Sequence, residues 1–391
     1  MTDGCKRKTT PGSPDAQKLA KRAKNHSDEE SLHAFQRLLD FSDLPEPTSI
    51  RQRFDDIGSA LLHDFLIVVR TPLGSDKVPD FVETKLQIME IELYFWDSTC
   101  HRDPFTHGSQ EQRAAGQWYF HRTPRRSDDS TQTLISTSGY RGGTRKGLDL
   151  TISTVKPTKS PYFPSSSSQP DGSEKKAYGG VLLRTLRDLN SGKIISGPSL
   201  LVDHILLLSG AHKISDLVQD HWGNDINAFK SPSVGESKTH MFLCPASTTN
   251  PKPHIYKSPR IGLDLSHPGT TASLSHPRVE FISQPYRYFV NPEKLMANGR
   301  AQTLLGVLPH KELSGLKDKT LNVYMAEYQT GLNGKAKLEE FVGARGKGIS
   351  SSPTKYMKLM GCIEALKSVK RDDGDGPRAN RIEKDNEKQT N

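Results

Sequence analysis

The chain is organised around Val82–His107, VETKLQIMEIELYFWDSTCHRDPFTH. From Thr84 to Phe95 the residue pattern predicts a strand, whose side chains alternate between two faces. One face would carry Leu86, Ile88, Glu90, Glu92 and Tyr94, and the other would carry Lys85, Gln87, Met89, Ile91, Leu93 and Phe95. A carboxylic acid among apolar neighbours tends to a raised pKa, which suits proton transfer near neutrality. The alternative is that this face is solvated and that the two glutamates are surface charges.

Polar residues gather where this strand ends. Asp97, His101, Asp103 and His107 fall within the next dozen positions. Because sites are usually built on loops that leave a rigid strand, we expect a functional site at this end of the strand.

The amino-acid composition is typical of a folded domain with long polar loops and tails. The chain has 391 residues, of which 33% are hydrophobic and 25% charged. The net charge of +9 favours a polyanionic partner such as nucleic acid. Its cysteines are far apart, which fits a reducing compartment and argues against zinc and disulfide frameworks. No apolar run approaches the roughly 18 residues of a membrane helix, and no apolar signal segment begins the chain, so we expect no membrane partner.

The chain divides into four predicted regions. Residues 1–45 are predicted to be a disordered basic arm. Its basic clusters at 6–8 and 18–24 resemble a bipartite nuclear localisation signal, so we expect the protein to be located in the nucleus. Residues 46–298 are predicted to form a domain, with low-complexity insertions at about 154–176 and 223–258. A helical extension over 299–368 and a disordered tail over 369–391 would follow.

Within the predicted domain, strands and helices alternate irregularly. A helix over 49–62 precedes an apolar strand over 65–71, which should pair antiparallel with the central strand. The remaining expected elements are strands at 116–122, 148–153, 178–184, 260–265 and 285–290, and helices beginning at 197 and 214. The fold class is therefore α+β, a single domain with a curved, mainly antiparallel sheet flanked by helices.

A glycine-rich segment, GYRGGTRKG over 139–147, carries three cations, Arg141, Arg145 and Lys146. Glycines let backbone N–H groups approach an anion, and the cations beside them would contact phosphate. The alternative is a glycine-rich hairpin tip with no ligand.

Six pieces in order make the chain resemble the alkyladenine (3-methyladenine) DNA glycosylases. They are the first helix with FLIVVR, MEIELY, VLLR, GPS, RIG and PYRYFV, spread over about residues 50–292. MEIELY is similar to the family's ETEAY strand, so the resemblance makes Glu92 the catalytic residue and Tyr94 a pocket residue. VLLR ends in Arg184, which matches the active-site arginine and would orient the water or the adjacent phosphate.

The resemblance also assigns the remaining pocket positions, several of them altered. His107 matches the pocket histidine, His121 falls at a pocket tyrosine, Asp149 falls at the family's asparagine, and Tyr140 matches the intercalating tyrosine. It implies a monomeric enzyme that binds double-stranded DNA with a damaged base, flips out the lesion and hydrolyses its N-glycosidic bond. It implies no metal and no cofactor, and because no lysine falls at the matched positions, it implies no lyase activity.

Two other functions compete with this one. A nucleic-acid-binding protein could keep the fold and lose the pocket, as the altered positions suggest. A metal-dependent nuclease could use His101, Asp103, His107 and His121, although their spacing matches no metal motif.

Overall fold

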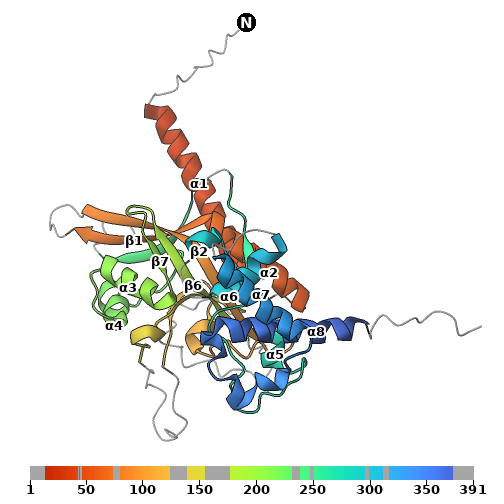
Figure 1. The fold of residues 1–391 in the computed structure, drawn as a ribbon. Coiled ribbons are helices and arrows are strands. Elements are labelled where there is room, and N and C mark those ends of the chain that lie inside the picture. The colour runs from red at the N-terminus through yellow and green to blue at the C-terminus, as the bar shows by residue number, and fades with distance from the viewer. Residues whose placement is uncertain are drawn as a thin grey trace, which may run out of the picture. The chain divides into compact units, whose positions relative to one another are not determined.

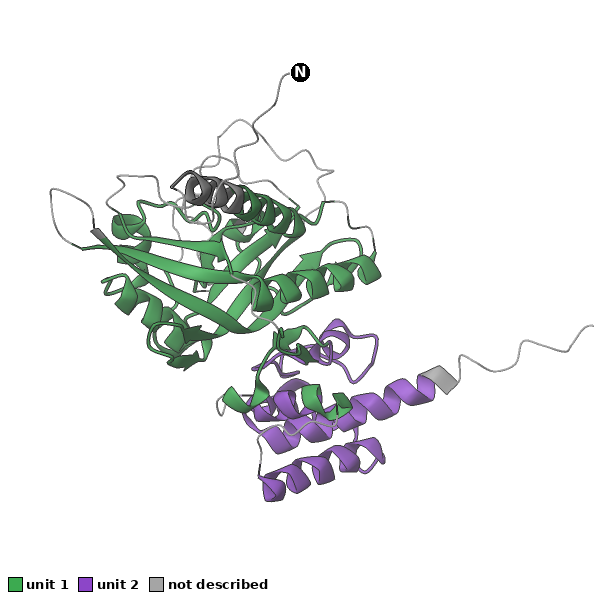
Figure 2. Cartoon of the chain, turned by 90° about the horizontal axis from the view of Figure 1, so that it is seen from above, with its two compact units in different colours: residues 1–258, 285–298, 306–312 green, residues 259–284, 299–305, 313–391 purple. Residues whose placement is uncertain are grey.

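The computed structural model describes residues 14–42, 44, 46–73, 80–123, 139–154, 177–230, 238–246, 251–295, 299–310 and 317–372. The chain splits into two compact units (Figure 2). Unit 1 comprises residues 1–258, 285–298 and 306–312, and unit 2 comprises residues 259–284, 299–305 and 313–391.

Unit 1 is built on one curled antiparallel sheet (Figure 1). Its central path runs β4-β5-β6-β2-β1-β8, and every strand pair is antiparallel. The strands are β1 Phe65–Leu73, β2 Asp80–Asp97, β3 His101–Arg102, β4 Trp118–Phe120, β5 Leu148–Ser153, β6 Ala177–Asp188, β7 Ile194–Ser196, β8 His240–Pro245, β9 Tyr256–Ser258 and β10 Arg287–Phe289. The helices of this unit are α1 Pro14–Leu38, α2 Pro47–His63, α3 Pro198–Leu208 and α4 Ile214–Asp216. An α+β fold with a curved antiparallel sheet is thus confirmed, as is the pairing of the first two strands.

A pair of β-bulges changes which residues of β2 share a face. Ile88 lies opposite Leu186, whereas Glu90 lies opposite Thr185, so two steps along β2 match one step along β6. Ile88 and Glu90 therefore point to opposite faces, and the expected uninterrupted alternation is wrong. Met89 is the extra residue of this bulge, and a bulge changes the direction of the side chains that follow it. As a result Ile88 lies on the apolar face, and Glu90 and Glu92 lie on the other face.

The apolar face of β2 forms the core of unit 1. Its buried members are Leu86, Ile88, Ile91, Leu93 and Phe95. Helix α2 covers this core with a buried stripe that includes Phe54, whose ring lies 6.1 Å from that of Phe41, while Phe41 lies 4.5 Å from Phe95. The prediction of a helix over 49–62 is confirmed.

The N-terminal arm is not disordered throughout, which corrects the prediction for 1–45. Residues 14–38 form α1, and Phe35 near its end is buried, with its ring 4.6 Å from that of Phe65. Leu39 and Phe41 are buried as well, so the end of the arm supplies apolar surface that the sheet can cover. The basic cluster at 6–8 lies outside the described residues, and nuclear localisation stays a prediction.

The two predicted insertions differ. Residues 155–176 of the first lie outside the described residues. The prediction of a low-complexity insertion over 223–258 is wrong, because this segment contains β8 and β9. Strand β8 pairs with β1 from His240 to Pro245, and its Met241 and Leu243 are buried. The apolar run of β8 is short and flanked by polar residues, so the composition of the segment did not indicate a strand.

Unit 2 is mainly helical. It contains α5 Pro277–Ile282, α7 Asp318–Leu332, α8 Pro353–Asp372 and the first part of α6 Arg300–Val307. The helical character predicted for residues 299–368 is confirmed in α7 and α8. Helices α7 and α8 approach closely at two glycines, because a Cβ at Gly331 would lie 2.1 Å from the carbonyl oxygen of Lys358.

The predicted boundary at 298 is wrong, because residues 259–284 belong to unit 2. The carbonyl of Leu265 accepts a hydrogen bond from the amide of Gly343 at 2.9 Å, and Lys367 donates to Ser283 at 2.8 Å. The segment 260–265 forms turns rather than the predicted strand. Residues 373–391 of the predicted tail lie outside the described residues.

Candidate functional site

Glu90 is a buried carboxylate held by two arginines. Its Oε1 accepts hydrogen bonds from Nε of Arg287 at 2.6 Å and from Nε of Arg184 at 3.1 Å, and the hydroxyl of Thr185 donates to its Oε2. Burial alone would raise the pKa of Glu90, but Arg287 and Arg184 together lower it from 4.5 to about 2. Glu90 therefore stays ionised at neutral pH. The raised pKa expected for an acid on this face is therefore wrong for Glu90, and so is the alternative of an exposed surface charge.

Glu92, two residues further along β2, is also fully buried but has different partners. The hydroxyl of Tyr94 donates to its Oε2 at 2.8 Å, and Nη1 of Arg184 donates to the same oxygen at 3.3 Å. Tyr94 is half-buried, whereas Arg184 is buried. Of these two contacts of Glu92, the one with Tyr94 therefore lies nearer to solvent. The structure thus brings the predicted Glu92, Tyr94 and Arg184 together.

Arg184 bridges the two glutamates because of the second bulge. Glu90 lies opposite Thr185 and Ile91 opposite Leu183, so Arg184 is the extra residue of β6 at this point. Burial alone would lower the pKa of Arg184, but Glu92, Glu90 and Tyr94 raise it above its ordinary value. Arg184 is only 7% exposed and its guanidinium is bonded to both glutamates. Its expected role of orienting a water or a phosphate stays a prediction.

A second polar cluster contains His107, His121 and Asp149. Nε2 of His121 donates to Oδ1 of Asp149 at 2.8 Å, and the rings of His121 and His107 meet edge to face at 4.6 Å. Burial and the neighbouring His121 lower the pKa of His107 to about 4, so this imidazole is neutral at pH 7. Both predicted pocket histidines are therefore in one place with Asp149.

Two glycines make room for this cluster. A Cβ at Gly147 would lie 2.5 Å from Nδ1 of His121, and a Cβ at Gly180 would lie 2.7 Å from Oδ2 of Asp149. Any larger residue at either position would displace the ring or the carboxylate. Since Gly180 pairs with Tyr94 across β6 and β2, the carboxylate of Asp149 lies next to the backbone position opposite Tyr94.

The two clusters share one face of the sheet. Glu92 lies opposite Leu182, Leu182 lies opposite Asp149, and Asp149 lies opposite Tyr119. Directly opposed residues point to the same side, so these side chains form one row across three strand spacings. Glu92 and Asp149 are separated by two spacings, about 10 Å between backbones.

Several residues of this face were missed by sequence reasoning. Arg287 is the most important, a fully buried arginine whose Nη1 also donates to Ser258 at 3.0 Å. Its signal was an arginine inside the apolar segment PYRYFV. The aromatic pair Trp96 and Tyr178, stacked at 5.1 Å, continues the face beyond Tyr94 and could have been found by extending the alternation of β2.

Tyr140, the predicted intercalating residue, is half-buried and its ring has two described neighbours. The guanidinium of Arg122 lies 3.7 Å from the centre of its ring, and Phe120 packs against it edge to face at 6.2 Å. Arg122 is itself bound to Glu111 at 2.6 Å. These contacts hold the ring of Tyr140 in place, and its insertion into DNA stays a prediction.

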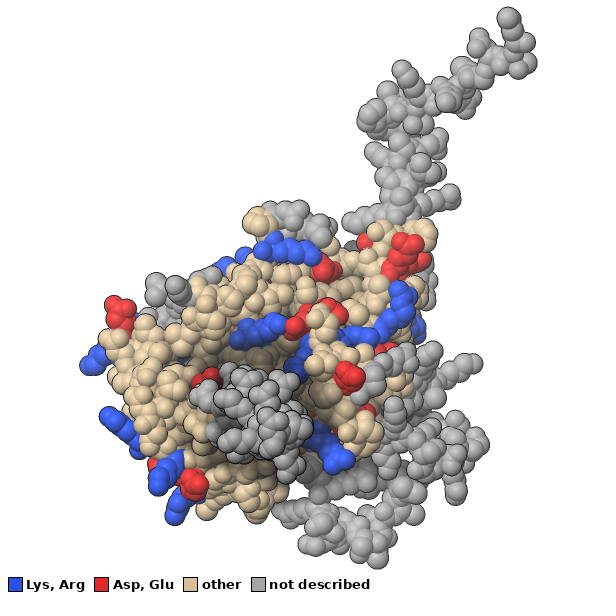
Figure 3. Space-filling model, turned by 90° about the vertical axis from the view of Figure 1, so that its right-hand side faces the viewer, with Lys and Arg blue, Asp and Glu red and all other residues tan. Residues whose placement is uncertain are grey.

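The predicted basic rim is partly engaged by the protein itself. Lys146 pairs with Asp203, and Nε of Arg141 donates to the carbonyl of Arg122 at 2.8 Å. Arg145 is exposed, so it is the member of this set that is best placed to meet a phosphate. On the face drawn in Figure 3, the cations and anions of the described residues are interspersed.

The metal-nuclease alternative fails on geometry. Nδ1 of His101 bonds the carbonyl of Phe95 at 2.8 Å and its Nε2 bonds the hydroxyl of Tyr286 at 3.0 Å, so both ring nitrogens are occupied. Asp103 is fully buried and accepts from the amide of Phe105. Among the described residues no group of three or more histidine, cysteine or acidic side chains could hold a metal ion.

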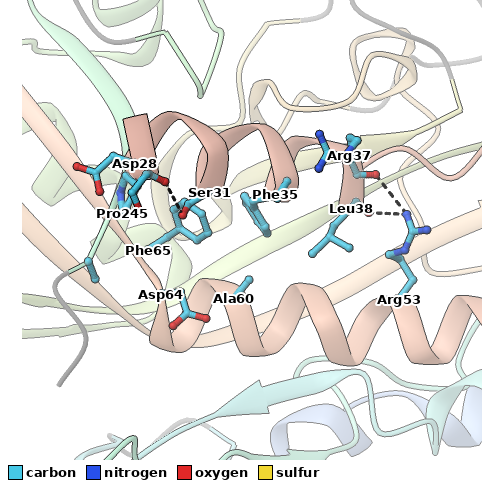
Figure 4. Close-up of a pocket in the computed structure, with 13 residues that line it drawn as sticks. Asp28, Ser31, Phe35, Arg37, Leu38, Arg53, Ala60, Asp64, Phe65 and Pro245 are labelled. Atoms are coloured by element: carbon cyan, nitrogen blue, oxygen red, sulfur yellow. Dashed lines mark hydrogen bonds between the residues drawn. The ribbon is translucent and has the colours of Figure 1, made fainter. Parts of the chain in front are cut away.

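A groove of about 690 Å3 lies outside this site, between α1 and α2 (Figure 4). At one end of this groove, Arg53 of α2 reaches the end of α1 and donates to the backbone carbonyls of Arg37 and Leu38 at 3.3 and 3.1 Å. These bonds satisfy carbonyls at the end of α1 that have no helical partner. The residues that line this groove, which come from α1, α2 and the ends of β1 and β8, include none of the candidate site.

Comparison with known proteins gives little more. No family model matches the chain, and no solved structure matches it. "Uncharacterized protein L759" of Acanthamoeba polyphaga mimivirus is 27% identical over 251 residues, which are 64% of this chain and 89% of the viral protein. Within the described part of the chain, no helix is long and apolar enough to cross a membrane.

Proposed function

We propose that this protein is a monofunctional DNA glycosylase that removes damaged purines. The observation that carries the proposal is Glu92, a fully buried carboxylate bonded to Tyr94 and Arg184 on the sheet face that also holds His107, His121 and Asp149. The resemblance of six ordered sequence pieces to alkyladenine DNA glycosylases supports the same reading. The basic clusters at 6–8 and 18–24, which resemble a bipartite nuclear localisation signal, support the further proposal that the protein is nuclear.

Glu92 would act as a general base. It accepts a proton from a water molecule as that water attacks C1′ of the flipped nucleotide, and the C1′–N bond breaks with its electron pair going to the base. An alkylated, cationic purine leaves as a neutral base. The carboxylate also stabilises the positive charge that develops on the sugar, and Arg184 fixes its orientation.

The remaining residues of the face would bind the base. Flipping a damaged base is favoured because the lesion pairs weakly in the duplex. Tyr94 would leave its hydrogen bond with Glu92 and stack on the base, with the ring of His107 or His121 on the other side, and each such stack contributes about 1–3 kcal/mol. The low pKa of His107 favours this role, because a neutral ring does not repel a cationic alkylated purine.

Neither a metal nor a cofactor enters this mechanism, since water, Glu92 and Arg184 supply the proton transfer and the charge. The two donors described for Glu92, Tyr94 and Arg184, offer no amine for a Schiff base, so none is proposed and the product is an intact strand with an abasic sugar.

The test is release of free base from an alkylated duplex by the full chain, with the abasic product measured in parallel. We expect release by the parent protein and a fall of at least about a hundredfold for Glu92→Gln, because a positioned base contributes about 10²- to 10⁴-fold. Glu83→Gln is the matched control, since Glu83 lies on the same strand, exposed and 3.8 Å from Arg70.

Each outcome has a clear meaning. Base release by the parent and the control but not by Glu92→Gln supports the enzyme. Lesion binding without any release by the parent protein would contradict it and would make the chain a non-catalytic nucleic-acid-binding protein, the alternative that the altered pocket suggested.

A further inference from the structure

In unit 2 (Figure 2), the connection between α7 and α8 carries exposed cations on a glycine-rich backbone. It reads GARGKG over 343–348, and a short turn at Ile349–Ser351 leads from there into α8. Arg345 and Lys347 are exposed, and so is Lys355 in the first turn of α8. We call these three side chains, with the backbone between them, the basic loop.

Buried residues and close backbone packing hold the basic loop in one conformation. Phe341 before it and Ile349 within it are buried. A Cβ at Gly346 would lie 2.4 Å from the carbonyl oxygen of Phe341, so only glycine fits there. The amide of Gly343 donates to the carbonyl of Leu265 at 2.9 Å, which ties the loop to another segment of unit 2. A loop that is already ordered loses less conformational freedom when it binds a partner.

The cations of the basic loop are not engaged by the part of the protein that the structure describes. Among the described residues, the side chains of Arg345, Lys347 and Lys355 form no ion pair and no hydrogen bond. By contrast, Lys358, one turn further along α8, pairs with Glu327 of α7 at 2.9 Å. The charge of the three loop cations is therefore left for a partner outside these residues.

The segment around the basic loop is positive. Residues 335–358 contain six lysines and arginines against two glutamates. One of the two, Glu340, accepts a hydrogen bond from the amide of Lys337 at 2.9 Å. Asp264, on a neighbouring segment, lies 3.5 Å from the hydroxyl of Ser350. Like charges at this density repel one another, and a polyanion removes that repulsion when it binds.

The side chains of the basic loop favour one kind of polyanion. The exposed residues of the segment 343–351 are small or cationic, namely Ala344, Arg345, Lys347, Gly348 and Ser351. A membrane surface would call for apolar side chains that enter the lipid, and a protein interface would call for large anchors at its centre. The phosphates of DNA are instead bound by arginine, lysine, serine and backbone N–H groups. A Cβ at Gly343 would meet nothing within 4 Å, so a phosphate has room to approach this backbone.

We propose that the basic loop of unit 2 binds the phosphate backbone of duplex DNA. Arg345, Lys347 and Lys355 supply the charge, and the glycines let the backbone come close to a phosphate. Contacts of this kind hold a protein on the duplex without reading its sequence. The proposal goes beyond base release, because it needs neither a damaged base nor a residue of the candidate site.

The test is the salt dependence of the affinity of the full chain for an undamaged DNA duplex. The variant carries Arg345→Ala, Lys347→Ala and Lys355→Ala together. Each lost phosphate contact lowers the slope of log affinity against log salt concentration by about one, so this slope should fall by about two to three. Lys347→Arg/Lys355→Arg should keep the parental slope, because the charge is retained. An unchanged slope in the triple alanine variant would overturn the proposal.

Lys317, Lys319 and Lys370 provide the matched control. They are exposed cations of the same helix pair, and they form no ion pair among the described residues. They lie at the other end of the pair from the basic loop, because α7 has 15 residues, about 22 Å, and the end of α7 packs on the start of α8. Replacing all three with alanine should lower the slope by less than one. An equal fall in the two triple variants would reflect net charge alone and would overturn the proposal.

Anionic vesicles distinguish DNA from a membrane surface. Vesicles that contain phosphatidylserine are titrated with the parent and the two triple variants in the same buffer. Vesicle binding that is lost only in the loop variant, together with an unchanged DNA slope, would assign the basic loop to a membrane and overturn the proposal. The DNA titration uses a duplex without a lesion, so its outcome does not depend on whether the protein releases a base.

Discussion

Glu90 and Glu92 lie two residues apart on one face of β2, yet their surroundings differ. Glu90 has two arginines and a threonine, and these donors hold its pKa at about 2. Glu92 shares Arg184 with Glu90 and also accepts from the hydroxyl of the half-buried Tyr94. A carboxylate held by two arginines does not take up a proton near neutrality, whereas in the proposed function Tyr94 moves aside and a substrate reaches Glu92.

Burial alone therefore does not mark a catalytic carboxylate. Both glutamates are almost fully buried, at 3% and 0% exposure. Among their described donors, Glu90 has two arginines and a threonine, whereas Glu92 has one arginine and a half-buried tyrosine.

The largest effect on stability is expected from Glu90→Gln. This change leaves the fully buried Arg287 without its carboxylate, and breaking a buried ion pair on one side costs about 3–5 kcal/mol in free energy of unfolding. Denaturant unfolding of the full chain measures it. Glu83→Gln, which breaks an exposed pair, should cost no more than about 1 kcal/mol. Equal losses for the two variants would show that the ion cluster around Glu90 is not structural.

A smaller effect is expected from acid. The pKa of Glu90 is about 2 in the folded protein against an ordinary value of 4.5, so the folded state binds this proton less readily than the unfolded chain. Its contribution is therefore complete above the ordinary pKa and is lost as the pH falls from about 5 towards 2. The difference in unfolding free energy between the parent and Glu90→Gln should shrink over this range. A difference that grows on acidification would contradict the lowered pKa.

The smallest effect concerns DNA contact. Arg145 is exposed, whereas Lys146 pairs with Asp203 and Arg141 bonds to a backbone carbonyl. Arg145→Ala should lower the slope of log affinity against log salt concentration by about one for duplex DNA, since one fewer counterion is released. Lys146→Ala should change the slope less. Identical slopes for the parent and Arg145→Ala would remove Arg145 from the interface.

The sequence predicted the site better than its surroundings. The pattern around Glu92 and the ordered family pieces predicted that Glu92, Tyr94 and Arg184 lie together, and they contact one another in the structure. His121 and Asp149 fit nearby because Gly147 and Gly180 have no side chains. The bulges at Met89 and Arg184 could not be predicted, because a bulge depends on the register of two strands and leaves the residue pattern of either strand unchanged.

Long-range partners were equally hidden. Arg287 reaches Glu90 across a sequence separation of 197 residues, so only the fold identifies its partner. Strand β8 is short and lies among polar residues, and the arm residues Phe35 and Phe41 are too few to indicate a packed helix by composition. In each case the missing information was which distant surface covers an apolar or charged residue.

The most direct measurement of the central claim is the single-turnover rate of base release by Glu92→Gln and Glu90→Gln, each corrected for the folded fraction. The account predicts that Glu92→Gln loses at least about a hundredfold while keeping affinity for the lesion duplex, because transition-state stabilisation is removed and stacking persists. Glu90→Gln should stay within a few-fold of the parent per folded molecule. A parent-like rate for Glu92→Gln, in a preparation that does excise bases, would contradict the assignment of the chemistry to Glu92.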